Sequence, residues 1–407
     1  MVQSAEMAHK GRRVILAVLW ITYIVVFLSR LSVGPLAPFL KEDLGITSAQ
    51  VGLIMSAAAL GYAVSGVPTG WVVDKIGAKW PIIIGEFIAG TTMMALFLVP
   101  SYILMLILMF VVGIGCGFLM PSTTQGVIAW FPPRERATVM GLKQTAVNVG
   151  GILSAVTLPA VALALGWRYG FLFLGMTAIA IGAMALVLYK NPPASTSSNS
   201  EGSAVVHKPS PVVELLKSRE IWLVALCGLC LTWVEMAMIA HLVLYLKEVL
   251  LFPVIAAGGL LAMTEAAGGI ARPGSGLLSD RVFVGKRRPV FMLIAGVTSA
   301  MCLLMGLLGP HLSWGLYPAL FVLGLVGVGF GGIYLTILSE FGGLGGAGKA
   351  AGLGGIFSTI GAALGPPLFG HIVDITGSYR LAWLSLAVVA ALCVLLLLFV
   401  REEKRKL

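Results

Sequence analysis

The chain has 407 residues, of which 58% are hydrophobic and only 11% are charged, and its formal net charge is +10. This composition excludes a soluble globular protein, because a soluble fold of this size could not cover so much apolar material with polar surface. A lipid bilayer is the solvent that such a chain requires.

Twelve apolar stretches are long enough to cross a bilayer, which takes roughly 20 residues in a helix. In chain order they cover residues 14–40, 48–73, 80–99, 102–127, 138–163, 168–190, 220–246, 254–279, 289–309, 313–340, 350–373 and 379–400. They do not alternate apolar and polar residues as the strands of a membrane β-barrel do. The sequence therefore predicts an all-α membrane protein with twelve transmembrane helices.

The cations indicate which side of the membrane each loop faces. With the N-terminus in the cytoplasm, most of the 27 Lys and Arg residues fall on inner segments, and Lys143 is counted among them. Cytoplasmic loops of membrane proteins carry such an excess of positive charge. We therefore expect a multi-pass protein of the cell (inner) membrane with both termini in the cytoplasm. The basic charge is explained in this way, so we expect no nucleic acid as a partner.

A polar linker divides the chain, and one loop motif occurs on both sides of it. Residues 191–218 are rich in Ser and Pro and predict a cytoplasmic linker between an N-terminal six-helix bundle, 1–190, and a C-terminal one, 219–407. The motif consists of Gly70, Asp74, Lys75 and Gly77 at the end of the second stretch, and of Gly276, Asp280, Arg281 and Gly285 at the end of the eighth. A signal repeated about half a chain later indicates two pseudo-symmetric bundles.

These two loops, the six-plus-six arrangement and the central linker resemble the major facilitator superfamily. The resemblance covers essentially the whole chain and implies transport by alternating access, in which two bundles rock about a central site. In that family the Asp, the Arg or Lys and the Gly of this loop form a cytoplasmic gate. The resemblance therefore implies a gate at both loops, whereas simple anchoring by positive charge would not place an acidic residue in each copy.

No constellation for bond-breaking chemistry or for a cofactor is present. The sequence lacks a set of Ser, His and Asp or of paired carboxylates, and its five Cys residues all fall inside apolar stretches. Residues 343–349 have the spacing of a phosphate-binding loop, but Ala350 stands where Ser or Thr should follow and no strand precedes the loop. We therefore expect no enzyme activity, no metal and no cofactor.

Arg30 lies inside the first stretch and is the best candidate for contact with a substrate. An ionisable group within the bilayer is costly and is functional by default, and the planar guanidinium can bind a carboxylate through two parallel hydrogen bonds. Tyr23 lies seven residues earlier, on about the same helix face. The surrounding segment is similar to the anion:cation symporter branch of the superfamily, in which an arginine here binds the anion. Ser29 and Cys116 replace two acidic residues of that branch, so its proton-coupling scheme does not transfer.

Four more polar positions follow within the later stretches. Glu86 lies in the third stretch and Glu235 in the seventh, and each is a candidate proton carrier. Gln144 and Asn148 are one turn apart in the fifth stretch, where they can contact substrate or join helices.

Arg272 in the eighth stretch begins an Arg-Pro segment that resembles monocarboxylate and oxalate–formate transporters. Monocarboxylate transporters have an Asp one turn before this Arg, where this chain has Gly268. Glu265 lies two turns before Arg272 on the same face. We expect Arg272 to bind substrate and Glu265 to carry a proton, with a Glu265–Arg272 salt bridge or a gate contact as the alternatives.

The sequence predicts a secondary active transporter for a small organic anion, a mono- or dicarboxylate, coupled to protons. Arg30 and Arg272 would contact the anion from opposite sides, because two cations in a low-dielectric cavity repel until an anion neutralises them. We expect the protein to act as a monomer. An anion antiporter and an exporter of lipophilic drugs are the alternative functions.

Overall fold

The structure is a computed structural model and describes residues 2–191, 215, 217–283 and 286–401. The predicted linker, 191–218, therefore lies almost entirely outside the described residues. The N-terminal half comprises α1 (Val2–Arg30), α2 (Val33–Leu44), α3 (Ser48–Ile76), α4 (Lys79–Ala95), the 3-10 helix η1 (Leu96–Leu98), α5 (Tyr102–Trp130), α6 (Pro133–Leu165) and α7 (Trp167–Leu188). The C-terminal half comprises α9 (Arg219–Glu248), α10 (Val254–Arg281), α11 (Arg287–Leu308), the 3-10 helices η4 (Gly309–His311) and η5 (Ser313–Gly315), α12 (Leu316–Gly327), α13 (Gly331–Thr376) and α14 (Tyr379–Leu398).

Twelve segments of the described chain are helical, long enough and apolar enough to cross a membrane, which confirms the predicted fold class. The first of these segments, Gly11–Leu44, contains a break. The helix stops at Arg30 and starts again at Val33, and the Ser32 hydroxyl donates a hydrogen bond to the Ser29 carbonyl at 2.7 Å. Pro35 explains the break, because in a continuous helix its ring would clash with the carbonyl of Leu31.

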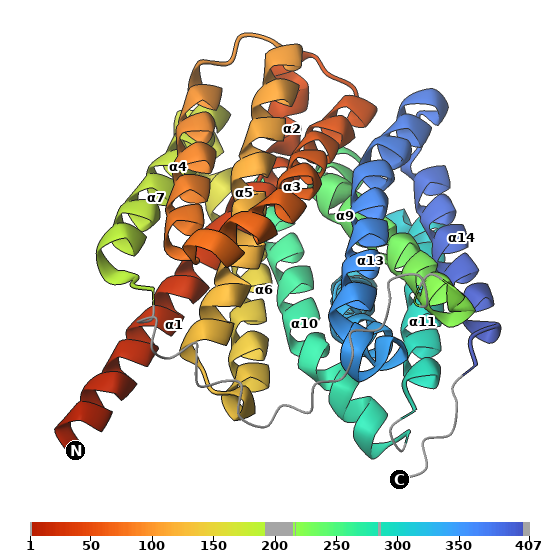
Figure 1. Ribbon diagram of the computed structural model, residues 1–407. Coiled ribbons are helices and arrows are strands. Elements are labelled where there is room, and N and C mark those ends of the chain that lie inside the picture. Colours follow the sequence, from red (N-terminus) through yellow and green to blue (C-terminus); the bar gives the residue numbers. More distant parts are fainter. Residues whose placement is uncertain (1, 192–214, 216, 284–285, 402–407) are drawn as a thin grey trace. The chain divides into compact units, whose positions relative to one another are not determined.

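The tenth membrane segment is also interrupted. Helix α12 ends at Gly327 and α13 begins at Gly331, within a run in which every second residue is Gly. Helix α13 then continues through the eleventh segment with a kink at Gly343, whose φ of 65° is favourable only for Gly. The tenth and eleventh membrane segments, Leu316–Gly343 and Gly346–Thr376, therefore meet at this kink in α13, which is blue in Figure 1.

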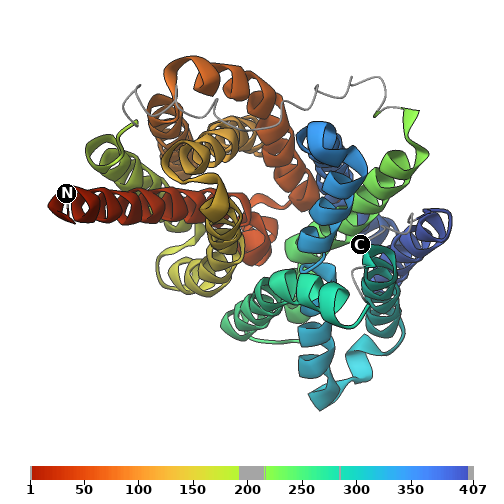
Figure 2. The same cartoon turned by 60° about the horizontal axis from the view of Figure 1, so that its bottom comes forward.

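The described residues form two compact units, which we describe separately. Unit 1 contains Met1–Phe39 and Ala57–Val205. Within it α4 packs between α5 and α7, and α1 packs against α6 (Figures 1 and 2). Helices α3 and α5 approach so closely that a Cβ on Gly113 would lie 2.1 Å from the Ala58 carbonyl oxygen. Small residues at such crossings allow the backbones of membrane helices to touch.

Unit 2 contains Leu40–Ser56 and Val206–Leu407. Helix α9 packs along α13, and α11 along α14. The segment Leu40–Ser56 belongs to this unit through specific polar contacts: the Asp374 carboxylate accepts hydrogen bonds from the Ser48 and Ala49 amides at 2.9 and 2.8 Å. Asp374 thereby satisfies two of the amides that the N-terminus of α3 leaves without a helical partner.

Candidate functional site

Arg30 ends α1 in unit 1 and contacts two aromatic rings. Its guanidinium carbon lies 4.2 Å from the centroid of the Tyr62 ring and 5.5 Å from that of Phe27. Among the described residues it makes no hydrogen bond and no ion pair, although a guanidinium carries five N–H donors. The rings orient the guanidinium, and its N–H donors have no acceptor among the described residues.

Tyr23 joins these rings into one cluster. The Tyr23 side chain is 2% exposed, and its ring packs edge-on against Phe27 with 5.2 Å between centroids. Tyr23 and Tyr62 are hydrogen-bonded through their side chains. We refer to Tyr23, Phe27 and Tyr62 as the aromatic cluster. It fixes the end of α1 against α3.

Lys143 on α6 is a buried cation that the sequence analysis assigned to a cytoplasmic segment. Its side chain is 2% exposed, and its ammonium lies 4.5 Å from the centroid of the Tyr23 ring. The ammonium donates hydrogen bonds to the hydroxyls of Thr124 at 2.9 Å and Thr123 at 3.3 Å. The signal was present in the sequence, because Lys143 falls inside the stretch 138–163 that we had read as membrane-spanning.

Gln144 and Asn148 lie on the same helix, α6, which packs against α1. Asn148 is buried, and Gln144 is half-buried with a side-chain oxygen that accepts no hydrogen bond from the described residues. Thr145, between them, accepts a hydrogen bond from the Trp20 indole at 3.0 Å. This segment of α6 therefore presents several polar groups toward helices of unit 1.

Glu86 on α4 is the buried carboxylate among the described residues of unit 1, with 1% of its surface exposed. One of its oxygens accepts no hydrogen bond from the described part of the chain, and no described cation lies within ion-pair distance. A carboxyl group in such surroundings is far less costly when neutral than when ionised. Glu86 therefore supplies no counter-charge to Arg30 or Lys143.

Arg272 and Glu235 form the ion pair of the predicted site in unit 2. The Nη2 atom of Arg272 on α10 lies 3.7 Å from Oε1 of Glu235 on α9. The sequence analysis had considered Glu265 as the salt-bridge partner, because it shares a helix with Arg272. Glu265 is also buried, at 2% exposure. The structure shows that the pairing runs between neighbouring helices, which sequence spacing does not reveal.

The two loop motifs differ in their contacts. In the first, Asp74 and Lys75 are exposed at the end of α3, and Gly77 terminates that helix with φ +79°. Asn191 stabilises this turn. Its side chain accepts a hydrogen bond from the Lys79 amide at 3.2 Å and donates one to the Ile76 carbonyl at 3.3 Å.

In the second loop, Arg287 bridges two carboxylates. It forms ion pairs with Asp280 and with Glu340 of α13, the latter at 3.4 Å. Arg281 follows Asp280 at the end of α10, Gly276 lies one turn earlier with open space around it, and Gly285 lies outside the described residues. The role of Arg287 was not anticipated, because the motif itself ends before it.

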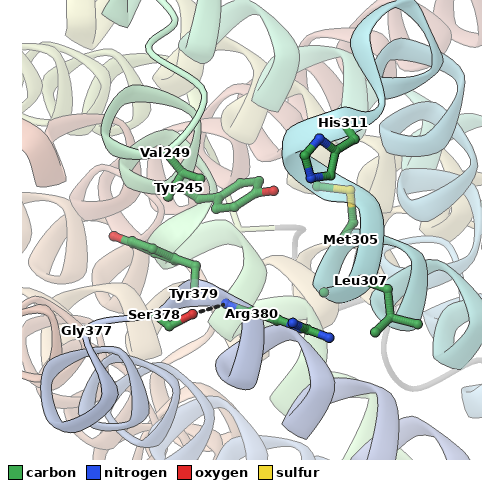
Figure 3. Close-up of a pocket in the computed structure, with 10 residues that line it drawn as sticks. Tyr245, Val249, Met305, Leu307, His311, Gly377, Ser378, Tyr379 and Arg380 are labelled. Carbon is green, nitrogen blue, oxygen red and sulfur yellow. Dashed lines mark hydrogen bonds between the residues drawn. The ribbon is translucent and has the colours of Figure 1, made fainter.

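A cavity of about 290 Å³ lies in unit 2, away from all of these residues. It is lined by residues of α9, α11, η4 and the start of α14, among them Tyr245, His311 and Arg380 (Figure 3). Figure 3 shows the Tyr245 hydroxyl directed toward Met305 and His311, while Ser378 accepts a hydrogen bond from the Arg380 amide at 3.2 Å. None of the predicted site residues lines this cavity.

Comparison with known proteins connects this arrangement to transport. The sequence model described as Major Facilitator Superfamily matches residues 19–366. The chain is similar to a probable sulfoacetate transporter of Cupriavidus necator, at 26% identity over 92% of this chain and 90% of that protein. It is similar to a hexuronate transporter of Bacillus subtilis, at 24% identity over 96% and 95% of the two chains. A bacterial homologue of the human lysosomal transporter Spinster has the same fold, with a TM-score of 0.80 at 18% identity over 96% of each chain.

Proposed function

Because this chain belongs to the major facilitator superfamily, a family of transporters and not of enzymes, we propose that it is a secondary active transporter of small organic anions. The observation that carries this proposal is the Arg30 guanidinium, which is held by two aromatic rings without any carboxylate partner among the described residues. Relatives named as transporters of sulfoacetate and of hexuronate support it, since both compounds are organic anions.

The anion we propose is a carboxylate or a similar oxyanion. A planar guanidinium matches the two oxygens of such a group and binds it through two parallel, charge-assisted hydrogen bonds. An exporter of lipophilic drugs would instead need a wide apolar site with an acidic anchor. In unit 1 the carboxylate Glu86 is buried, whereas the cation Arg30 is half-buried and makes no ion pair with a described residue. This difference favours the anion transporter.

Protons are the coupling ion that we propose, and Glu235 is the carrier that the geometry supports best. Glu235 lies against Arg272, so its protonation would remove the counter-charge and make Arg272 available to an anion. Loss of the proton would restore the ion pair and weaken anion binding. Glu265, our expectation from sequence, remains the second candidate, followed by Glu86. An anion antiporter would use the same cations without net proton movement.

The loops containing Asp74 and Asp280 act as gates in this proposal. In the second loop, ion pairs of Arg287 tie α10 and α11 to α13, so these helices would move together. A gate contact stabilises one conformation and thereby controls turnover without contacting the substrate. We further propose that the protein works as a monomer in the cell (inner) membrane with both termini in the cytoplasm, as the distribution of positive charge favours.

Reconstituted protein tests the proposal directly. Proteoliposomes loaded with a panel of labelled carboxylates and sulfonates should exchange at least one of them with unlabelled anion outside. A proton gradient directed into the proteoliposomes should drive accumulation of the same anion inside them. Exchange without accumulation would favour the antiporter, and export of lipophilic cations without any anion transport would reject the proposal.

A further inference from the structure

Lys143 in unit 1 has no role in the transport scheme above. Its side chain is 2% exposed, and the polar contacts of its ammonium are two neutral hydroxyls, those of Thr123 and Thr124. No carboxylate of the described residues lies within 4 Å of it. The ammonium is thus solvated by the protein but is not neutralised by it.

A buried and uncompensated charge is costly, and it carries a function more often than a structural role. An ammonium inside a membrane protein is energetically unfavourable unless it is paired. A structural lysine would be expected to pair with an acid, yet the buried acid of this unit, Glu86, lies outside ion-pair distance. The described residues supply no counter-charge to Lys143, and a bound anion would supply one.

Lys143 and Arg30 contact different rings of the same aromatic cluster. The ammonium lies against Tyr23 at 4.5 Å, and the guanidinium lies against Tyr62 at 4.2 Å and Phe27 at 5.5 Å. Tyr23 in turn packs against Phe27 and is hydrogen-bonded to Tyr62. The aromatic cluster therefore brings two cations into one region of unit 1.

We propose that Lys143 and Arg30 bind the two anionic groups of one substrate molecule, so that the site selects compact dianions over monoanions. The planar guanidinium binds one carboxylate or sulfonate through two parallel hydrogen bonds, and the ammonium attracts the second group as a point charge. A dianion neutralises both cations, whereas a monoanion leaves Lys143 without a counter-charge. This inference rests on the proposed function, since it specifies the substrate class of the same site.

Matched pairs of probe compounds, which differ in the presence of a second anionic group, measure the contribution of that group to binding. Sulfoacetate carries a carboxylate and a sulfonate, and methylsulfonylacetate has nearly the same shape with the carboxylate alone. Succinate with succinamate, and D-glucarate with D-gluconate, form two further pairs. Binding of all six compounds to the purified full-length protein is measured by isothermal titration calorimetry and by thermal stabilisation, which depends on ligand occupancy.

The variants compared are Lys143→Met, Lys143→Arg, Arg30→Met and the control Lys190→Met. Lys190 is a cation of the same unit with an exposed side chain. The wild-type protein should bind at least one dianion about tenfold or more tightly than its monoanionic partner, as expected for one charge-assisted contact. Lys143→Met should reduce that preference to less than about threefold by weakening the dianion alone. Lys143→Arg should retain much of the preference, Arg30→Met should weaken both probes, and Lys190→Met should change neither.

The thermal stability of the ligand-free protein separates this role from a structural one. Lys143→Met removes an uncompensated buried charge, so its melting temperature should equal or exceed that of the wild type. A lower melting temperature with an unchanged dianion preference would mean that Lys143 is a structural residue and would overturn the inference. Equal affinities of the wild type for dianion and monoanion would overturn it while leaving the proposed function intact. Binding of none of the six anions would reject the proposed function itself.

Discussion

Replacing Arg30 should remove anion binding and leave a folded protein. The Arg30 guanidinium contributes to the fold through contacts with the Tyr62 and Phe27 rings, and it makes no hydrogen bond or ion pair with a described residue. Each cation–π contact of a half-buried group is worth about 0.5–1 kcal/mol. The free energy of unfolding should therefore fall by no more than about 1–2 kcal/mol in Arg30→Met.

The loss of affinity should be much larger than the loss of stability. Two charge-assisted hydrogen bonds to one carboxylate contribute about 1.5 kcal/mol each at the low end of the measured range. Together they amount to about 3 kcal/mol, which is roughly a 100-fold change in Kd because 1.4 kcal/mol corresponds to tenfold. Arg30→Lys should lose less, since it retains the charge but not the planar fork.

The assay is calorimetric titration of purified variants with the anion that the wild type transports, followed by exchange in proteoliposomes. Arg168→Met is a matched control, because Arg168 also lies over an aromatic ring, Trp167, at 4.3 Å from its centroid. That variant should bind and exchange anion like the wild type. Binding by Arg30→Met within about threefold of the wild type would refute the reasoning. If the melting temperature of Arg30→Met is far below that of Arg168→Met, Arg30 is primarily structural.

Three further predictions concern gating, coupling and packing. Asp74→Asn should slow exchange several-fold with little change in Kd, and a large loss of affinity at normal turnover would place Asp74 in the binding site instead. Glu235→Gln should abolish pH-driven accumulation while preserving exchange of labelled for unlabelled anion, which needs no net proton movement; if Glu265→Gln alone has this effect, Glu265 is the carrier. Gly113→Ala should lower the free energy of unfolding by about 1–3 kcal/mol because the added Cβ would overpack against Ala58. Thermal melting measures the effect, and Gly141→Ala is the control because its added Cβ meets nothing within 4 Å.

The sequence by itself determined the solvent, the number of membrane segments and the family. These properties follow from local composition, because a helix that crosses a bilayer must be apolar along its own length. The place of Arg30 within the first segment is likewise a local property. Tyr23 could be assigned to the Arg30 face because the helical period relates residues seven positions apart.

Only the tertiary structure decided which polar side chains meet. The pairing of Arg272 with Glu235 joins two helices, and the position of Lys143 against Tyr23 joins residues 120 positions apart in the printed sequence. Neither contact has a periodic signature, because the crossing of two helices depends on side-chain packing along their whole length and not on spacing within either helix. For the same reason, the sequence analysis counted Lys143 among the cytoplasmic cations. Its charge could be counted from the sequence, but its burial depends on α1 and α5 packing around it.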